Sequence, residues 1–103
     1  MIGSATSRNG IVIRLTDERW SHITEEHSEM AGMRFEVLET LPQAERIYKG
    51  NDGELFAVRE IETGKYLIVI YRENESDGFI ITAFLTRRIK SLETRELLWL
   101  VPK

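Results

Sequence analysis

The sequence predicts an α+β fold in which two N-terminal helices pack on one face of a four- to five-stranded antiparallel sheet. The chain has 103 residues, enough for one domain with a single core between a helical layer and a sheet. A segment with helical apolar spacing lies in the first third of the chain. Stretches rich in Ile, Val and Tyr, separated by short polar turns, follow it. Helices followed by a run of closely connected strands are typical of this fold class.

The N-terminal part is expected to contain a short strand and two helices. Residues 11–15 are mostly β-branched and predict a strand, and Thr16 is a candidate N-cap for a helix that continues to about Met30. One stripe of this helix consists of Trp20, Ile23, His27 and Met30. A second helix is predicted over residues 34–41, with Pro42 ending it.

The rest of the chain predicts an antiparallel meander. Strands are expected over residues 45–49, 55–61, 65–72 and 79–87, with a final edge strand over 97–101. Asn-Asp-Gly between the first two of these strands is a hairpin signal. We expect residues 1–10 to be a flexible leader and residues 11–103 to form a single globular domain.

Composition and charge limit the classes of function. The chain has no cysteine, which removes disulfides, thiolate zinc sites and cysteine nucleophiles and favours a cytoplasmic location. No apolar run reaches the roughly 18 residues of a membrane span, so no membrane partner is expected. The net charge of −3 does not favour a large polyanionic partner. The local cluster of Arg87, Arg88 and Lys90 is compatible with a small nucleic-acid contact.

The two histidines of the chain, His22 and His27, are the candidate proton-transfer groups. They lie about 140° apart around a helix, so they cannot both ligate one metal ion from an unbroken helix. We expect neither a metal nor a cofactor. Imidazole is well suited to general acid or base catalysis near neutral pH. The alternatives are a half-buried structural role for His27 and a solvated position for His22.

The strand predicted over residues 79–87 carries a second group of candidates. Strand alternation would set Phe79, Ile81, Ala83 and Leu85 on the core side and Ile80, Thr82, Phe84 and Thr86 on the other. Two threonines flanking an aromatic ring on an open face resemble a ligand platform, although threonine is also simply a good strand residue. Arg87 and Arg88 would point to opposite faces, so only Arg88 shares the Thr82 side if the strand stays regular.

Arg59 and Tyr66 complete the candidates on the predicted sheet. Arg59 lies in the middle of a strand, where an arginine usually occupies the wet face. There it could pair with a carboxylate such as Glu45 or bind phosphate through two hydrogen bonds. Tyr66 and Tyr71 lie on opposite faces of their strand, so only one of them can join a platform with Phe84.

Two motifs resemble those of a known nuclease group. The segment Glu18-Arg-Trp-Ser-His-Ile-Thr-Glu-Glu-His-Ser-Glu-Met30 is similar to an H-I-x-x-x-H-P-E helix, with Ser28 in place of proline. The segment Gly78-Phe-Ile-Ile-Thr-Ala-Phe-Leu-Thr-Arg-Arg88 is similar to a late strand that reads V-x-T-A-Y-x-T. Together they resemble the phage-type barnase/EndoU/colicin/RelE-like small nuclease domains, which implies a barnase/RelE-like fold over roughly residues 11–90. The resemblance implies an active site of His22 or His27 with Thr82, Thr86 and Arg87 or Arg88.

The leading functional hypothesis is a metal-independent, toxin-like endoribonuclease. A histidine would transfer the proton, Arg59 or Arg88 would stabilise the phosphorane, and Thr82 or Thr86 would hydrogen-bond to phosphate. Arg87, Phe84 and Tyr66 would bind the substrate. RNA and an antitoxin or immunity protein are the expected partners, and the protein would be a monomer or homodimer. The alternatives are a non-catalytic module that docks protein or single-stranded nucleic acid on an open sheet face, and a structural dimer that pairs two such faces.

Overall fold

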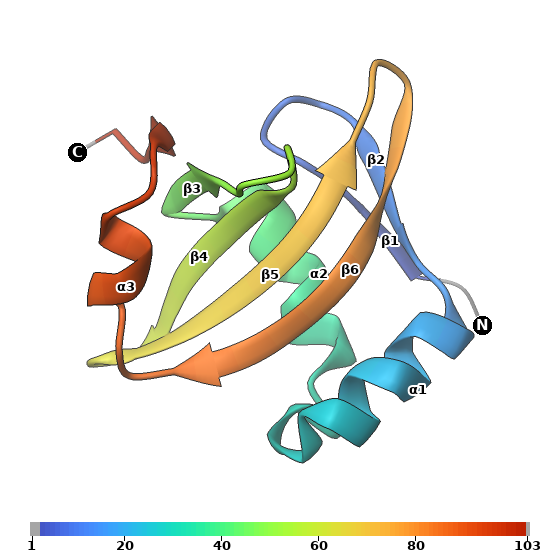
Figure 1. Ribbon diagram of the computed structural model, residues 1–103. Helices are drawn as coiled ribbons and strands as arrows, with labels where there is room; N and C mark the ends of the chain where they lie inside the picture. Colours follow the sequence, from blue (N-terminus) through green and yellow to red (C-terminus); the bar gives the residue numbers. More distant parts are fainter. Residues whose placement is uncertain (1–2, 103) are drawn as a thin grey trace.

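One mixed sheet organises residues 3–102, which the computed structural model of the protein describes (Figure 1). Within them, the strands are β1 (Gly3–Thr6), β2 (Val12–Leu15), β3 (Arg46–Lys49), β4 (Leu55–Glu62), β5 (Lys65–Glu73), β6 (Asp77–Thr86) and β7 (Leu97–Leu100). Their order across the seven-stranded sheet is β1-β2-β6-β5-β4-β3-β7. Neighbouring strands are antiparallel except for the parallel pair β2 and β6.

The α+β class is confirmed, but the expectation of a four- to five-stranded antiparallel sheet is wrong. β2 pairs in parallel with the start of β6. Two helices and three strands lie between β2 and β6 along the chain, and a connection of this length lets the chain return in the same direction. β7 is the predicted edge strand at the C-terminus and pairs with β3. The segment expected to be a flexible leader contains β1, which pairs with β2 over Gly3–Thr6. Residues 1–2 of that segment and residue 103 lie outside the described residues.

The helices differ in length and position from the prediction. α1 (Asp17–Glu26) begins at Thr16, whose side-chain oxygen accepts a hydrogen bond from the Arg19 amide at 3.1 Å. It stops before the expected end at Met30, because the chain turns at His27 into the 3₁₀ turn η1 (Ser28–Met30). α2 (Arg34–Gln43) includes Pro42, which the prediction placed just beyond its end. A further helix, α3 (Lys90–Glu93), precedes β7.

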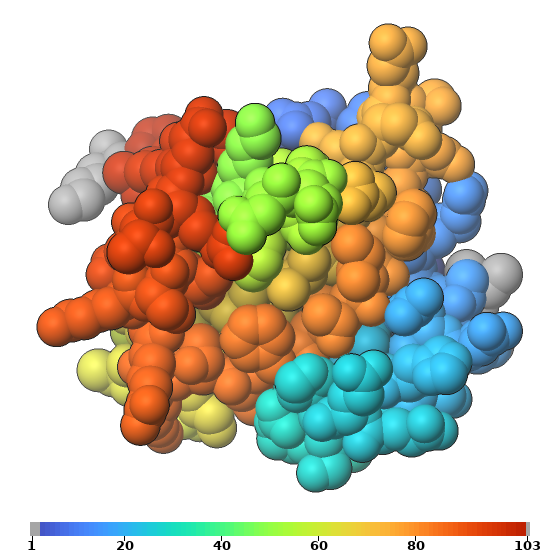
Figure 2. Space-filling view, in the orientation of Figure 1, coloured from blue at the N-terminus to red at the C-terminus, as the bar shows by residue number. Residues whose placement is uncertain are grey.

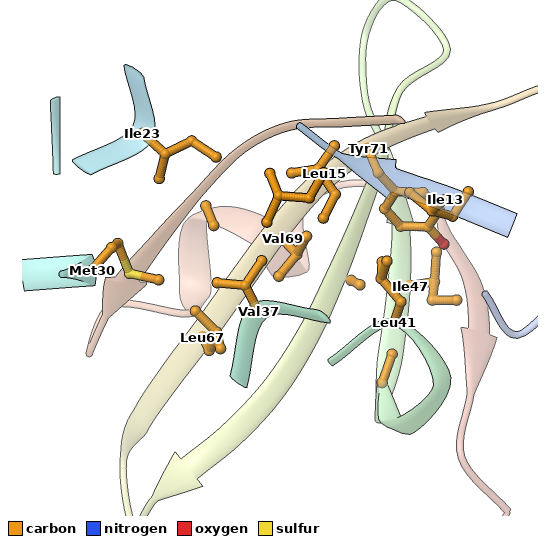
Figure 3. Packing of buried hydrophobic residues seen from close by; sticks show 14 residues of the cluster. Ile13, Leu15, Ile23, Met30, Val37, Leu41, Ile47, Leu67, Val69 and Tyr71 are labelled. Carbon is orange, nitrogen blue, oxygen red and sulfur yellow. The ribbon is translucent and has the colours of Figure 1, made fainter. Parts of the chain in front are cut away.

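The main core lies between the sheet and α2, which runs behind the sheet in Figure 1. Figure 3 shows Val37 of α2 beside Leu67 and Val69 of β5, and Leu41 of α2 beside Ile47, near Tyr71. α1 was expected to pack beside α2 on this face. It lies instead along the edge of β6, in the part of β6 beyond β2, and contributes Ile23 to the main core.

A register shift in β6 changes which residues face the main core. Thr82 pairs with Ile70 and Ile80 pairs with Tyr71, so Ile81 is an extra residue on β6. Ile80 therefore lies in the main core with Ala83, and the prediction that Phe79 and Ile81 share the core side with Ala83 is wrong. Beyond the bulge the alternation is regular, and Thr82, Phe84 and Thr86 share one face as expected.

The other side of the sheet, here called the open face, is covered only at one end. In the order of the strands it carries Arg46, Tyr48, Phe56, Val58, Tyr66, Ile68, Ile70, Thr82, Phe84 and Thr86. Leu92 of α3 packs against Tyr48, Phe56, Val58 and Ile68 in a second, smaller apolar cluster. Figure 2 shows atoms of β5 and β6 at the centre of this face, between the red-orange C-terminal segment and the cyan turn after α1.

Candidate active site

His27 borders the open face because α1 ends there. Its φ of −132° and ψ of 79° leave the helical region, and its amide still donates to the Ile23 carbonyl at 2.8 Å. Ile23 and Met30, its neighbours on the predicted stripe, are buried in the main core. The imidazole instead stands 5.8 Å from the Phe84 ring, measured between centroids. The break in the helix therefore separates the histidine from the core stripe and directs it to the open face.

The Glu29 carboxylate lies close to the His27 imidazole. Its Oε2 lies 3.7 Å from Nδ1 of His27, and the two side chains are 43% and 34% exposed. A carboxylate beside Nδ1 leaves Nε2 for a reacting group. His22, by contrast, is exposed on α1. Of the two predicted histidines, His27 is the one that the structure brings to the platform.

The two threonines differ in their hydrogen bonding. The Oγ1 of Thr86 accepts a hydrogen bond from the Arg88 amide at 3.0 Å, so the hydroxyl proton remains available to an incoming acceptor. The Oγ1 of Thr82 is buried and has no hydrogen-bond partner within the described residues. A buried hydroxyl without a partner costs about 1–3 kcal/mol. The Thr86 hydroxyl can thus donate to an anionic oxygen on the open face, whereas the Thr82 hydroxyl is enclosed.

Arg87 and Arg88 directly follow Thr86, the last residue of β6. β6 ends at Thr86, so strand alternation does not fix the sides of Arg87 and Arg88, and both are exposed. A cavity of about 280 Å³ lies at this end, lined by Glu29, Lys65, Leu85, Thr86 and Arg87. Glu29 also contacts His27. The lining of this cavity therefore combines the Thr86 hydroxyl, the cations of Lys65 and Arg87, and the carboxylate that lies beside the imidazole.

Arg59 is not part of this arrangement, although the sequence placed it with Thr82 and Thr86. It pairs with Leu67 of β5, a main-core residue, and therefore lies on the face that α2 covers. Its Nη1 stands 3.7 Å from Oε1 of Glu39 on α2. The expectation of a wet face fails because the open face of β4 is occupied by its even-numbered residues, Phe56 and Val58.

Arg46 takes the place on the open face that the sequence assigned to Arg59. Its guanidinium donates to the Tyr48 hydroxyl and to Glu93, both at 3.2 Å, and its central carbon lies 5.9 Å from the centre of the Tyr66 ring. The hydrogen bond with Tyr48, followed by the Glu93 carboxylate, raises the pKa of Arg46, so the group stays charged. Tyr66 in turn is the register partner of Thr86.

Sequence reasoning missed Arg46, Glu29 and Glu93 for identifiable reasons. β3 is too short for its alternation to indicate which side faces the core, so Arg46 had no assigned face. Glu93 reaches Arg46 only because α3 folds back over the sheet. Glu29 was assigned to a continuing helix, whereas the 3₁₀ turn brings it to His27. The sequence did contain a signal for Glu29, because it lies two residues after His27 in the same histidine motif.

The described residues contain no group of three or more His, Asp or Glu side chains placed to hold a metal ion. None of the helices in residues 3–102 is long and apolar enough to cross a membrane. Comparisons with protein-family models, curated proteins and solved structures give no match to this chain.

Proposed function

We propose that the protein is a metal-independent endoribonuclease that cleaves single-stranded RNA at the His27 end of the open face. The observation that carries the proposal is the position of the His27 imidazole, 5.8 Å from Phe84, on the strand face shared by Thr82 and Thr86. A proton-transfer group, the Thr86 hydroxyl and cations thus lie near one partly exposed aromatic ring. Bases of a single strand stack readily on such rings.

The reaction requires a proton acceptor and stabilisation of a negatively charged phosphorane. His27 takes the proton of the ribose 2′-hydroxyl, and the 2′-oxygen attacks the adjacent phosphorus. A 2′,3′-cyclic phosphate forms as the bond to the 5′-oxygen breaks, and the leaving oxygen takes up a proton. The Thr86 hydroxyl donates a hydrogen bond to a phosphate oxygen, while Arg87 or Arg88 supplies positive charge. Thr82 is the second hydroxyl on the same face.

The remaining groups bind and orient the substrate. Glu29 orients the His27 ring, and Phe84 offers a stacking surface between the threonines. Arg46 and Tyr66 extend the platform toward α3. The similarity of the Glu18–Met30 and Gly78–Arg88 segments to the barnase/EndoU/colicin/RelE-like domains supports the same reaction. We extend the proposal to a toxin-like protein of the cytoplasm that an antitoxin or immunity protein inhibits by covering this face.

Incubation of the purified protein with total RNA, with and without chelator, tests the activity. We expect cleavage in both conditions and products with cyclic phosphate ends. His27→Ala should lower the cleavage rate by about 10²–10⁴-fold, the usual contribution of a general acid or base. The matched control is His22→Ala, which removes the other imidazole from the same helix and should retain full activity. Equal activity of the His27→Ala and wild-type proteins would refute the assignment.

A non-catalytic binding module is the second candidate, favoured by the apolar residues Ile70 and Phe84, which are partly exposed on the open face. If the wild-type protein cleaves none of the RNAs tested, this function replaces the first. Phe84→Ala should then abolish binding of the partner, whether protein or single-stranded nucleic acid, and both histidines should be dispensable.

A further inference from the structure

A polar cavity of about 490 Å³ lies beside the open face, where the β3–β4 turn meets the segment between α3 and β7. Lys49 and Arg95 supply two positive charges to its lining. The side-chain amide of Asn51 and the Ser91 hydroxyl add hydrogen-bond donors, while the Thr94 hydroxyl already donates to the Ser91 carbonyl at 2.9 Å. Figure 2 shows the turn in green directly beside the red-orange segment. Cations combined with hydroxyl and amide donors are the groups that bind phosphate.

Arg95 is held in position before any ligand arrives. Its guanidinium stacks on the Phe56 ring, with 4.6 Å between the central carbon and the ring centre. Its Nη1 donates to the Asn51 side-chain oxygen at 3.2 Å. A guanidinium fixed on both sides loses little rotational freedom when it binds an anion. The contact with Phe56 also connects the cavity to the open face, because Phe56, Ile70 and Thr82 are register partners across β4, β5 and β6.

Two carboxylates limit the charge of the ligand that this cavity can hold. Glu96 contributes to the lining. Glu54 accepts a hydrogen bond from the Asp52 amide at 2.9 Å. That bond, followed by the positive charges of Arg72 and Arg95, lowers the pKa of Glu54, so this carboxylate stays ionised. The cavity therefore suits one singly charged phosphodiester better than a polyphosphate.

We propose that this cavity is a second phosphate subsite, in which Arg95 and Lys49 hold a backbone phosphate of a single-stranded RNA that crosses the open face. The subsite deepens the proposed function and rests on it for the identity of the ligand. The scissile phosphate lies at His27 and Thr86, and the subsite lies at the far end of the Thr82–Ile70–Phe56 row. Thr86 is four residues from Thr82 along β6, at about 3.3 Å per residue, and Phe56 is two strands from Thr82, at about 4.8 Å per strand. The two positions are therefore roughly 16 Å apart. The substrate must then be longer than a dinucleotide.

Binding of uncleavable RNA tests the subsite separately from the chemistry. A labelled six-nucleotide RNA with 2′-O-methyl groups is titrated by fluorescence anisotropy against the wild-type, Arg95→Gln and Lys49→Gln proteins. Each variant should bind roughly tenfold more weakly, as for a lost hydrogen bond to a charged group. The slope of log K against log salt should fall by about 0.7 per lost phosphate contact. Cleavage of a dinucleotide substrate should be the same in all three proteins.

The chain offers a matched control on the opposite side of the sheet. Arg8 stacks on Trp99 at 4.4 Å and donates to the Ala44 carbonyl, so Arg8→Gln removes the same charge and the same type of contact from the main-core side. This variant should bind the RNA as the wild type does. Lys49 is exposed, and Lys49→Gln therefore gives a result even if Arg95→Gln unfolds.

The outcomes separate this inference from the proposed function. Wild-type affinity in both Arg95→Gln and Lys49→Gln overturns the subsite, while cleavage that depends on His27 would still support the nuclease. Equal weakening in Arg8→Gln also overturns it, since the effect would then be one of total charge. Binding that depends on Arg95 and Lys49 without any cleavage supports the subsite and refutes the nuclease. A wild-type protein that does not bind the RNA overturns the subsite.

Discussion

At the scale of single residues, the Tyr71 hydroxyl is a polar group enclosed by the main core. Tyr71 is 0% exposed, and its hydroxyl has no hydrogen-bond partner within the described residues. Burial, followed by the charge of Glu73, raises the pKa of the Tyr71 phenol. The ring contributes apolar contact to the core, whereas the hydroxyl contributes only a cost of desolvation.

Removal of that hydroxyl should therefore be harmless at neutral pH. We expect the free energy of unfolding of Tyr71→Phe to equal that of the wild type or exceed it by up to about 1 kcal/mol. The raised pKa in the folded state means that unfolding favours deprotonation, so wild-type stability should fall as the pH rises above about 10. Tyr71→Phe should lose this alkaline dependence. Urea unfolding at pH 7 and above pH 10 measures both effects, and a large loss at pH 7 would indicate an unseen partner for the hydroxyl.

His27 should matter for stability as well as for the proposed chemistry. Its half-buried ring packs on Phe84 and borders the break between α1 and η1. His27→Ala should lower the free energy of unfolding by about 1–3 kcal/mol, whereas the exposed His22→Ala should change it by less than about 0.5 kcal/mol. Thermal melts of the two variants provide the comparison. Identical melts would show that the ring contact contributes nothing measurable.

At the scale of elements, β6 depends on a close approach at Gly78. This residue pairs with Ile13 of β2 and lies opposite Glu73 at the end of the β5–β6 hairpin. A Cβ atom there would overlap the Arg72 carbonyl oxygen and the Cδ1 atom of Ile13. The close approach of β5 and β6 at the end of their hairpin thus requires glycine at this position.

Gly78→Ala should lower the free energy of unfolding by about 1–3 kcal/mol, the range for an overpacked interior site. The backbone carbonyl cannot move aside as a flexible side chain could, so the strands must separate. Ser76→Ala, an exposed change in the same hairpin, is the control and should stay within about 0.5 kcal/mol of the wild type. A Gly78→Ala protein as stable as this control would show that β5 and β6 tolerate a wider spacing.

Arg59 connects α2 to the sheet through Glu39. The pair is partly exposed, at 23% and 33%, so Arg59→Ala should cost only about 1 kcal/mol through the lost pair and the lost packing of the side chain. RNA cleavage should not change, because the residue lies on the covered face. A urea melt and the cleavage assay on the same preparation measure both. Loss of activity without loss of stability would place Arg59 in the site after all.

These elements show what local sequence can and cannot predict. The apolar periods of β4, β5 and β6 and the Thr16 cap are local properties, and the predicted strands and helix start were found where expected. β1 has the sequence Gly-Ser-Ala-Thr, which lacks an apolar period, and it forms only by pairing with β2. The bulge at Ile81 and the face of Arg59 depend on the partner strand, which no local period encodes. The platform of Thr82, Phe84 and Thr86 was predictable because the strand is regular beyond the bulge.

At the scale of the whole molecule, the sheet is stabilised unequally on its two sides. The main core joins α1, α2 and five strands in one cluster of buried side chains. The second cluster on the open face is smaller and is covered by Leu92 of the four-residue helix α3 and by Ile89, which precedes that helix. A surface that must admit a ligand cannot also be fully covered, so the open face should have the lower local stability.

The two leucines that close these clusters make the difference measurable. Leu41→Ala should lower the free energy of unfolding by about 2–5 kcal/mol, because a cavity forms in a fully enclosed core. Leu92→Ala should cost about 2 kcal/mol or less, since a short surface helix can collapse into the space. Hydrogen exchange should accelerate throughout the sheet in Leu41→Ala but mainly in α3 and β7 in Leu92→Ala.

Because α3 also positions the segment that carries Arg95, Leu92→Ala should weaken RNA binding. Leu41→Ala should leave RNA binding unchanged under conditions where the protein is folded. Equal losses of stability with uniform exchange in both variants would instead mean that the two faces unfold as one unit.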